Sequence, residues 1–341
     1  ASVAGAWFLS FAIVAVNVLV YEALTPRRSR RTAVQAIVLA AAFVLFWLIG
    51  SRSIDRAAGS GETISVALIQ PSVTREEKEA FGARLLVLDR LRALAARAQP
   101  GSLLIYPEAA WPGVLLEEER DGLFADYVRS IDRPSLFGAV ERVEGRYYNS
   151  ALMVASDASV LGRYPKIRLV PFGEFVPFRS WFSFIEVLNE VGDMTPGTGP
   201  VTFRHLGAVV SPVICFEDVF PDMVAGAVRA GATVLVNMTD DSWFGGHPQA
   251  YQHLLIARMR AVENGRALIR AANTGVSCVI LPDGSVGNVV DQGGRDVFVE
   301  GIAHARVPVR EAMTPFTRFS FAFPLTVILV LGLCFYKSRR M

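Results

Sequence analysis

The stretch VVSPVICFEDVFP, from Val209 to Pro221, decides the fold class and contains the residue on which the chemistry depends. Its first half is apolar and β-branched, which predicts a buried strand, and Pro221 with the residues after it indicates the start of a helix. Cys215 therefore stands where a strand gives way to a loop and a helix. Strand ends display the reacting groups of many α/β proteins, and a helix N-terminus or a nearby cation stabilises a thiolate. The alternative is a buried structural cysteine.

The chain from residue 63 onwards alternates strand and helix patterns in the same way. TISVALIQ at 63–70 predicts a strand, recurring leucines at 76–98 predict a helix, and SLLIYPE predicts a strand that ends at Glu108. The remaining expected elements are a helix at 117–130, strands at 135–141, 147–156 and 232–238, a helix at 249–264, strands at 266–273 and 275–282, and a closing segment at 296–308. We therefore predict one α/β domain from residue 63 to residue 314.

Two segments in the middle of the chain do not fit regular elements. GRYPKIRLVPFGEFVP at 162–177 has enough proline and glycine to predict a loop, and this loop carries Lys166 and Glu174. RSWFSFIEVLNEVGDM at 179–194 concentrates large apolar residues on what could be a short helix. Such a helix either packs on the core or forms an amphipathic arm that enters the membrane surface or covers a lipid-sized pocket.

Apolar residues make up 52% of the chain, and the excess is concentrated in three uncharged stretches at 1–21, 32–50 and 319–336. Each stretch is about long enough to cross a bilayer as a helix. The first two are too long and too uniform for buried helices of a soluble core, whereas Pro324 interrupts the third and leaves that alternative open. We predict two transmembrane helices within residues 1–50, a polar linker at 51–62, and a C-terminal transmembrane helix at 319–336.

Two basic clusters predict how these helices are oriented. PRRSRR at 26–31 joins the first two helices, and KSRR at 337–340 follows the third. Because lysine and arginine in short loops stay in the cytoplasm, both clusters place residues 51–318 on the outer side. The chain begins almost inside its first helix, without an initiator Met, so we expect an upstream part. The net charge of +2 is too small to suggest binding to nucleic acid.

The cysteines and histidines do not predict a disulfide framework or a metal site. Cys334 lies in an expected membrane helix, and Cys215 could pair with Cys278 only if the two lie close in space. The four histidines lack metal-ligand spacing, and His247 and His253, near the start of a helix, suggest a surface or capping role. We therefore expect neither a metal nor another cofactor.

Three strand ends or adjoining loops thus carry a carboxylate, a cation and a thiol, in Glu108, Lys166 and Cys215. Acyl transfer through cysteine needs a base for the thiol proton, a positive charge for the thiolate and the oxyanion, and an exposed strand end. No histidine stands near a second strand end to form a Cys–His pair. Taken singly, Glu108 could be an ordinary loop carboxylate and Lys166 a solvated surface lysine.

Five segments resemble the carbon–nitrogen hydrolase (nitrilase) superfamily and, within it, the apolipoprotein N-acyltransferase branch. They are YPEAAWP at 106–112, RYPKIRLVPFGEFVP at 163–177, VICFEDVFP at 213–221, NMTDDSWFG at 237–245 and ARMRAVENGRALIRAANTGVSCVILPDG at 257–284. The resemblance implies a nitrilase-like αββα sandwich with a Glu108, Lys166 and Cys215 triad. Glu174 and the Phe216–Glu217 pair favour the acyltransferase branch. Asp240 departs from the usual Asn, and the family has several more N-terminal membrane helices.

The function that this resemblance implies is acyl transfer at the outer face of a bacterial cytoplasmic (inner) membrane. A phospholipid would give its acyl chain to Cys215 as a thioester, and the N-terminal amine of a diacylglyceryl-cysteine apolipoprotein would receive it. Glu174 and Glu217 would orient Lys166 or the incoming groups. Core packing is the alternative for each residue expected to line the acyl path, namely Trp111, Phe175, Trp181, Phe182, Phe216 and Trp243. The rival functions are a membrane-tethered amidase or nitrilase and an inert membrane scaffold.

Overall fold

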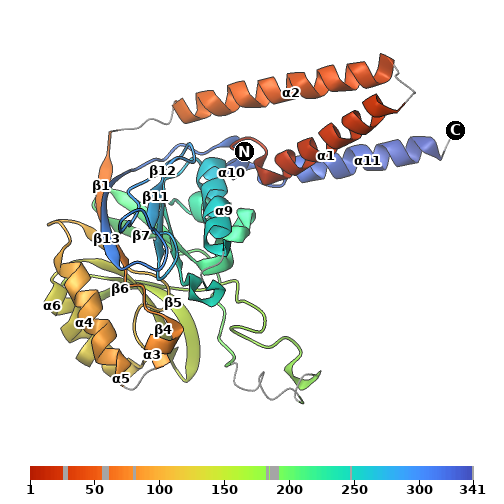
Figure 1. Cartoon of the computed structure of the whole chain (residues 1–341). Helices are drawn as coiled ribbons and strands as arrows, with labels where there is room; N and C mark the ends of the chain where they lie inside the picture. The colour runs from red at the N-terminus through yellow and green to blue at the C-terminus, as the bar shows by residue number, and fades with distance from the viewer. Residues whose placement is uncertain are drawn as a thin grey trace.

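The computed structural model describes residues 1–25, 30–55, 61–79, 82–181, 184, 192–245 and 248–339. Its centre is a sandwich of two β-sheets with helices on the outer faces, and three long helices extend from one end of the sandwich (Figure 1). This arrangement agrees with the αββα sandwich that the resemblance implies.

The first sheet has seven strands, in the order β13–β1–β2–β4–β5–β6 with β3 paired to β4. The strands are β1 (Thr63–Gln70), β2 (Leu103–Ile105), β3 (Val114–Leu115), β4 (Ser135–Val143), β5 (Arg146–Val154), β6 (Val160–Pro165) and β13 (Gly301–Pro308). β1, β2 and β4 are parallel, while β13, β5 and β6 are antiparallel to their neighbours. The last strand of the domain therefore lies beside its first.

The second sheet has six strands, in the order β12–β11–β10–β9–β8–β7. The strands are β7 (Phe203–His205), β8 (Ala208–Ile214), β9 (Val234–Thr239), β10 (Leu268–Ala272), β11 (Cys278–Ile280) and β12 (Val286–Gly287). β8, β9 and β10 are parallel, so their carboxyl ends meet at one edge of the sheet. This edge is where Cys215 follows β8.

Helices complete the layers on each side. The first sheet is accompanied by α3 (Arg75–Glu79), α4 (Ala83–Ala96), α5 (Glu117–Glu119), η1 (Arg120–Phe124) and α6 (Ala125–Ile131), and the second by α8 (Pro221–Arg229) and α9 (Gln249–Asn264). Shorter turns are η2 (Arg179–Trp181), η3 (Cys215–Val219), η4 (Asp241–Phe244) and α10 (Pro315–Arg318). The long helices at the end are α1 (Gly5–Leu24), α2 (Arg30–Asp55) and α11 (Ala322–Ser338).

The apolar runs of the sequence form strands because both faces of each sheet are covered. In β1, Val66 and Leu68 face the other sheet, whereas Ala67 and Ile69 pack with α4. Side chains alternate between the two faces of a strand, and here both faces are buried, so the run is apolar at nearly every position. The core between the sheets joins β1 to β8, β9 and β10.

The predicted helix at 249–264 agrees with the bounds of α9, but three other predictions need correction. Residues 51–55, expected in a polar linker, continue helix α2, which ends at Asp55. Residues 162–165 belong to strand β6 and are not part of a loop. A side chain at Gly162 would lie 2.8 Å from the ring of Phe203, so this glycine serves close packing. The helix expected at 76–98 is two helices, because Gly82 has a left-handed backbone between α3 and α4.

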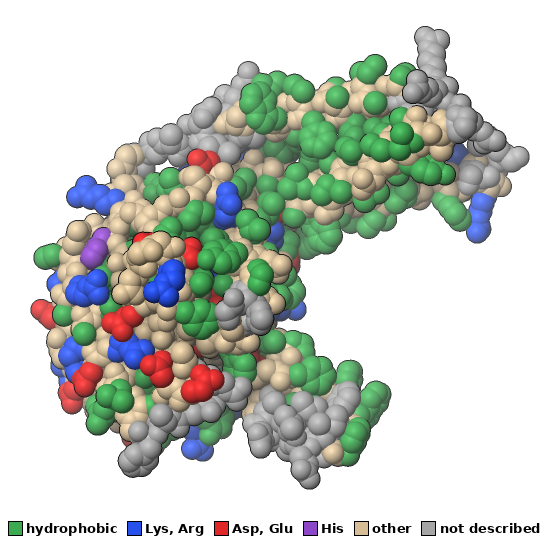
Figure 2. Space-filling view, in the orientation of Figure 1, with side chains coloured by type: hydrophobic (Ala, Val, Ile, Leu, Met, Phe, Trp, Pro, Cys, Tyr) green, Lys and Arg blue, Asp and Glu red, His purple; other side chains and the backbone are tan. Residues whose placement is uncertain are grey.

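The three helices outside the sandwich expose extensive apolar surface (Figure 2). By length and composition, α1 is long and apolar enough to cross a membrane, whereas the apolar parts of the other two are shorter, at Ala33–Ile49 and Ala322–Lys337. Phe8 of α1 contacts Phe46 of α2 and Phe323 of α11, with ring centroids 4.2 and 5.6 Å apart. By length and composition, one of the three predicted membrane helices, α1, could therefore cross a membrane.

Candidate active site

Three strand ends bring the predicted triad into one region of the sandwich. Glu108 follows β2, and Lys166 follows β6, both in the first sheet, while Cys215 follows β8 in the second sheet. The inner core places these sheets face to face, so the region is enclosed by both. The charge of Lys166 interacts with both Glu108 and Cys215. Residues far apart in the chain therefore share one electrostatic environment.

Lys166 is 1% exposed and lies between two carboxylates. Its Nζ donates to Oε1 of Glu108 at 3.1 Å and to Oε1 of Glu174 at 2.9 Å. Burial alone would lower the pKa of Lys166, but the nearby negative charges raise that pKa above its ordinary value. The ammonium group thus remains charged although it is buried, and the alternative of a solvated surface lysine is wrong.

Asn149, in the middle of β5, joins the same two carboxylates. Its Nδ2 donates to Oε1 of Glu108 at 2.7 Å and to Oε1 of Glu174 at 2.9 Å. Asn149 and Lys166 therefore close a ring of four hydrogen bonds with the two glutamates. The sequence interpretation did not single out Asn149, although a polar residue within the apolar run of a buried strand was the available signal.

The second oxygen of Glu108 makes a different contact. The backbone N–H of Asp240, just after β9, donates to Oε2 of Glu108 at 2.9 Å. The Asp240 carboxylate itself pairs with Lys78 at 2.5 Å and accepts a hydrogen bond from Asn273. The departure from the usual Asn thus creates an ion pair to α3, while the backbone of the same residue helps to hold Glu108.

Cys215 begins η3 with a left-handed backbone, at φ 52°. Such a conformation costs on the order of 1–3 kcal/mol for a residue other than glycine and persists when the surroundings enforce it. Asn237 of β9 donates from Nδ2 to the carbonyl of Cys215 at 3.0 Å. The sequence predicted a strand end at this position. The strained turn also fixes the direction in which the Cys215 side chain points.

The surroundings of Cys215 favour a protonated thiol. Burial raises the pKa of Cys215 well above its ordinary value, as does the negative charge of Glu108. Lys166 and a hydrogen bond with Thr239 oppose this rise without cancelling it. Attack by this thiol would therefore require a base to take its proton, which is the role expected of Glu108.

Glu217, two residues after Cys215, is fully buried and accepts four hydrogen bonds. The donors are the backbone N–H groups of Ile167, Arg168 and Ile214, at 2.6, 3.0 and 2.7 Å, and the hydroxyl of Tyr164, at 2.8 Å. Glu217 thus ties the chain on both sides of Lys166 to the end of β8. Glu174 contacts the Lys166 side chain directly, whereas Glu217 contacts the backbone around Lys166.

The aromatic residues expected along the acyl path occupy different environments. Trp111 is buried with Phe124 and Phe137 on the helical side of the first sheet, in agreement with the core-packing alternative and not with an acyl path. Trp181 and Trp243 are each 72% exposed, Phe216 is exposed, and Phe175 is partly buried. Phe182 lies outside the described residues.

The prediction of a surface or capping role for His253 is wrong. This side chain is 3% exposed and lies between the carboxylates of Asp218 and Asp241, at 3.1 Å from each. His247, its predicted companion, lies outside the described residues. Among the described residues, no group of three or more His, Cys, Asp and Glu side chains is placed to hold a metal ion.

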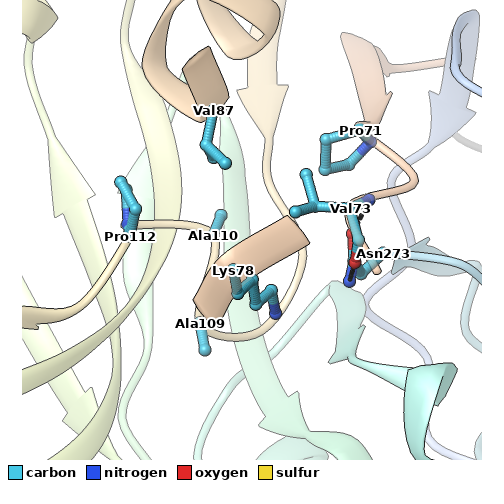
Figure 3. Close-up of a pocket in the computed structure, with 8 residues that line it drawn as sticks. All are labelled: Pro71, Val73, Lys78, Val87, Ala109, Ala110, Pro112 and Asn273. Atoms are coloured by element: carbon cyan, nitrogen blue, oxygen red, sulfur yellow. Dashed lines mark hydrogen bonds between the residues drawn. The ribbon is translucent and has the colours of Figure 1, made fainter. Parts of the chain in front are cut away.

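A small pocket is lined in part by Ala109 and Ala110, which follow Glu108 in the same loop (Figure 3). Its lining is mostly apolar and consists of Pro71, Val73, Lys78, Val87, Ala109, Ala110, Pro112 and Asn273. These residues do not include the predicted triad.

The family described as carbon-nitrogen hydrolase matches residues 65–308, which include all these residues. The chain belongs to the carbon-nitrogen hydrolase family. Among curated members, it is 31% identical to an apolipoprotein N-acyltransferase of Geobacter metallireducens, over 95% of this chain and 63% of that protein. It is 36% identical to an apolipoprotein N-acyltransferase of Ralstonia nicotianae, over 82% of this chain and 54% of that protein. The chain thus spans about six tenths of the length of these relatives.

Solved structures of the nitrilase superfamily share the fold of this carbon-nitrogen hydrolase family member. An amidase of Nesterenkonia AN1 matches with a TM-score of 0.55 and 20% identity, covering 73% of this chain and 92% of the amidase. Nit3 of Saccharomyces cerevisiae matches with a TM-score of 0.53 and 18% identity, covering 76% of this chain and 93% of Nit3. At these identities the likeness supports the nitrilase-like fold alone.

Proposed function

We propose that this member of the carbon-nitrogen hydrolase family is an apolipoprotein N-acyltransferase. It takes a fatty acyl chain from a phospholipid and transfers it to the N-terminal amine of a diacylglyceryl-cysteine lipoprotein. The observation that carries the proposal is the buried ion pair of Lys166 and Glu108, held in one electrostatic environment with Cys215. The names of the curated relatives support the choice of substrates.

In the first half-reaction, the Cys215 thiol attacks the carbonyl carbon of the phospholipid acyl ester. Oε1 of Glu108 already accepts from Lys166 and Asn149, whereas Oε2 accepts the N–H of Asp240, so Oε2 has more room to take the thiol proton. The Lys166 ammonium stabilises the negative charge that develops on the carbonyl oxygen. The C–O bond then breaks, Glu108 returns the proton to the leaving alkoxide, and a lysophospholipid departs.

In the second half-reaction, the neutral α-amine of the lipoprotein attacks the thioester. Glu108 takes a proton from the attacking nitrogen, the C–S bond breaks, and the sulfur receives the proton to regenerate the thiol. An amide and the free enzyme result. The raised pKa of Cys215 favours this step in one respect, because the site stabilises the protonated thiol at the end of the cycle.

The proposed donor is a phospholipid and the proposed acceptor carries lipid chains, which agrees with the exposed apolar side chains after Lys166. Phe178, Trp181 and Phe184 are strongly exposed on the segment that follows Lys166, and the rings of Phe178 and Trp181 stack with centroids 5.2 Å apart. Helices α1, α2 and α11 would anchor the domain to the bacterial cytoplasmic membrane, with residues 51–318 on the outer side. Apolar cover over the thioester would then keep water away until the amine arrives.

Hydrolysis is the second candidate reaction, because the family description names carbon–nitrogen hydrolysis and the same three groups would serve it. Intact-mass spectrometry after incubation with phospholipid vesicles separates the two. We expect an acyl adduct on Cys215 that persists with phospholipid alone and discharges when a diacylated lipopeptide with a free amine is added. Steady release of free fatty acid without an amine, at the rate of adduct formation, would instead identify a hydrolase.

Two cysteine variants make the adduct experiment specific. Cys215→Ser should lose the adduct and retain the fold, because the change removes the thiol and little volume. Cys278→Ser is the matched control, since Cys278 is buried in β11 among apolar residues of the second sheet. Equal loss of turnover from both variants would contradict the assignment of Cys215 as the nucleophile.

A further inference from the structure

A second group of buried charges lies behind the Cys215 turn and takes no part in the proposed reaction. It joins η3, η4, β9, α9 and β10, and its members are Asp218, Asp241, His253, Arg270 and Asn237. All five side chains are at most 3% exposed. Burying four ionisable groups is costly unless they are paired, so the arrangement requires a reason.

The geometry indicates that His253 is an imidazolium. Its Nε2 lies 3.1 Å from Oδ1 of Asp218, and its Nδ1 lies 3.1 Å from Oδ1 of Asp241. An ionised carboxylate only accepts hydrogen bonds, so both ring nitrogens must carry a proton to satisfy both contacts. A neutral ring would leave one nitrogen lone pair facing a carboxylate.

Arg270 completes the charge balance of the cluster. Its guanidinium donates to Oδ2 of Asp241 at 2.9 Å and lies 3.8 Å from Oδ2 of Asp218. Two cations thus face two carboxylates. Burial and the charge of Arg270 lower the pKa of His253, but its hydrogen bonds to Asp218 and Asp241 outweigh them and raise that pKa to about 9. Arg260, also on α9, interacts with Asp218 and is itself paired with Glu263.

Two connections lead from the cluster to the nucleophile. Asp218 lies on η3, the same turn that Cys215 begins. Asn237 accepts from Arg270 at 2.5 Å and donates to the carbonyl of Cys215 at 3.0 Å. The cluster therefore holds the Cys215 turn through its backbone on one side and through η3 on the other, and the strained φ of Cys215 needs such support.

We propose that His253, as a buried imidazolium paired with Asp218 and Asp241, is a positioning residue that holds Cys215 in its reactive orientation. The proposal rests on the assignment of Cys215 as the nucleophile, and it adds a pH limit to the enzyme. When His253 loses its proton, the two carboxylates retain Arg270 as the cation within the cluster, while Arg260 is shared with Glu263, and the repulsion between the carboxylates loosens η3. Acylation of Cys215 then slows in alkaline solution, although a thiol without this control would react faster there.

The test measures the burst of nitrophenolate when the full chain, in detergent, is acylated by a p-nitrophenyl fatty acyl ester. This donor contains no phospholipid or lipoprotein, so the result is independent of the proposed substrates. We expect the acylation rate of the unchanged protein to fall with a midpoint near pH 9. His253→Gln should reduce the rate at pH 7 by about 100-fold, as a small displacement of a reacting atom does, and should abolish the alkaline midpoint.

Three further variants make the outcome decisive. His304→Gln, the same change on β13 away from the cluster, should preserve both the rate and the midpoint. Asp218→Asn removes one carboxylate and retains the histidine, so the midpoint of the alkaline fall in acylation rate should move to lower pH. If His253→Gln does not fold, this shift alone tests the role of His253. Unchanged rates and midpoints in the two cluster variants would overturn the proposal. A burst that survives Cys215→Ser would instead overturn the assignment of the nucleophile.

Discussion

At the scale of single residues, the sequence offered candidates for the chemistry more readily than it offered the residues that contact them. Glu108, Lys166 and Cys215 stand at strand ends or in the loops next to them, where the reacting groups of α/β proteins are commonly displayed. Asn149 and His253 were not assigned roles in the site, because their partners come from segments distant in the chain. Periodicity shows that a polar residue lies on a buried face, but it does not show what that residue contacts there.

The ring of Asn149, Lys166, Glu108 and Glu174 leads to a prediction about the acylation rate. Asn149→Ala removes one hydrogen bond from each glutamate, so both carboxylates lose a contact that fixes their position. We expect kcat/KM to fall about tenfold or more over the whole pH range, in keeping with about 1.5–3 kcal/mol for a hydrogen bond to a charged group. The measurement is the pH–rate profile of Cys215 acylation.

Two variants serve as references for Asn149→Ala. Asn149→Asp keeps the shape but places a third carboxylate in the ring, so it should be the more damaging change. Asn288→Ala makes the same truncation at an exposed position, where the side chain donates only to the carbonyl of His304, and should leave the profile unchanged. An Asn149→Ala profile that coincides with that of the unchanged protein would show that the ring does not control Glu108.

At the scale of elements, uninterrupted periodic patterns were predicted well, whereas segments that contain a structural glycine or proline were not. α9 has sixteen residues and a regular helical pattern, and its predicted bounds hold. β6 was interpreted as a loop because Gly162 and Pro165 interrupt six residues. The structure explains both, since Gly162 makes room for Phe203 from β7 and Pro165 ends the strand. The roles of Gly162 and Pro165 depend on how the two sheets pack, and the local sequence does not show that packing.

Glu217 is the contact that joins two of these elements, the end of β6 and the end of β8. Glu217→Gln keeps the volume but replaces one accepting oxygen with a donating NH2 group, so two of the four donors lose their partner. Each unsatisfied buried group costs about 1–3 kcal/mol. We expect a lower free energy of unfolding by about 2–5 kcal/mol and slower acylation of Cys215, measured by thermal unfolding and by the nitrophenolate burst.

Tyr164→Phe is the matched control for this prediction. It removes one of the four hydrogen bonds and leaves the backbone contacts of Glu217 intact. We expect a loss of about 1 kcal/mol in the free energy of unfolding, with little change in the acylation rate. If Glu217→Gln were no more harmful than Tyr164→Phe, the connection between the two sheets would not depend on Glu217.

At the scale of the whole molecule, α9 connects the candidate site to the helices outside the sandwich. His253 lies near its start, and Glu263, one residue before its end, accepts the backbone N–H of Ala6 in α1 at 2.7 Å. Gly5 packs against Phe316 and Glu263 with a left-handed backbone, where a side chain would have no room. Helix α9 is therefore fixed at both ends, to the turn of Cys215 through His253 and Asp218 and to α1 through Glu263.

The orientation of the chain across the membrane gives a prediction for the whole molecule. We expect the arginines of 26–31 and the basic residues of 337–340 to hold their loops in the cytoplasm, which would place the domain between them outside. A reporter enzyme that is active only outside the cytoplasm should be active when it is inserted after Gly59 and inactive when it is fused after Met341. Replacing Arg27, Arg28, Arg30 and Arg31 with Gln should weaken the signal of the reporter after Gly59, because the positive charge sets the orientation. As a control, the same number of Arg→Gln changes on the exposed surface of the domain should not weaken it. A silent reporter after Gly59 together with an active one after Met341 would mean that Cys215 faces the cytoplasm, where exported lipoproteins could not reach it.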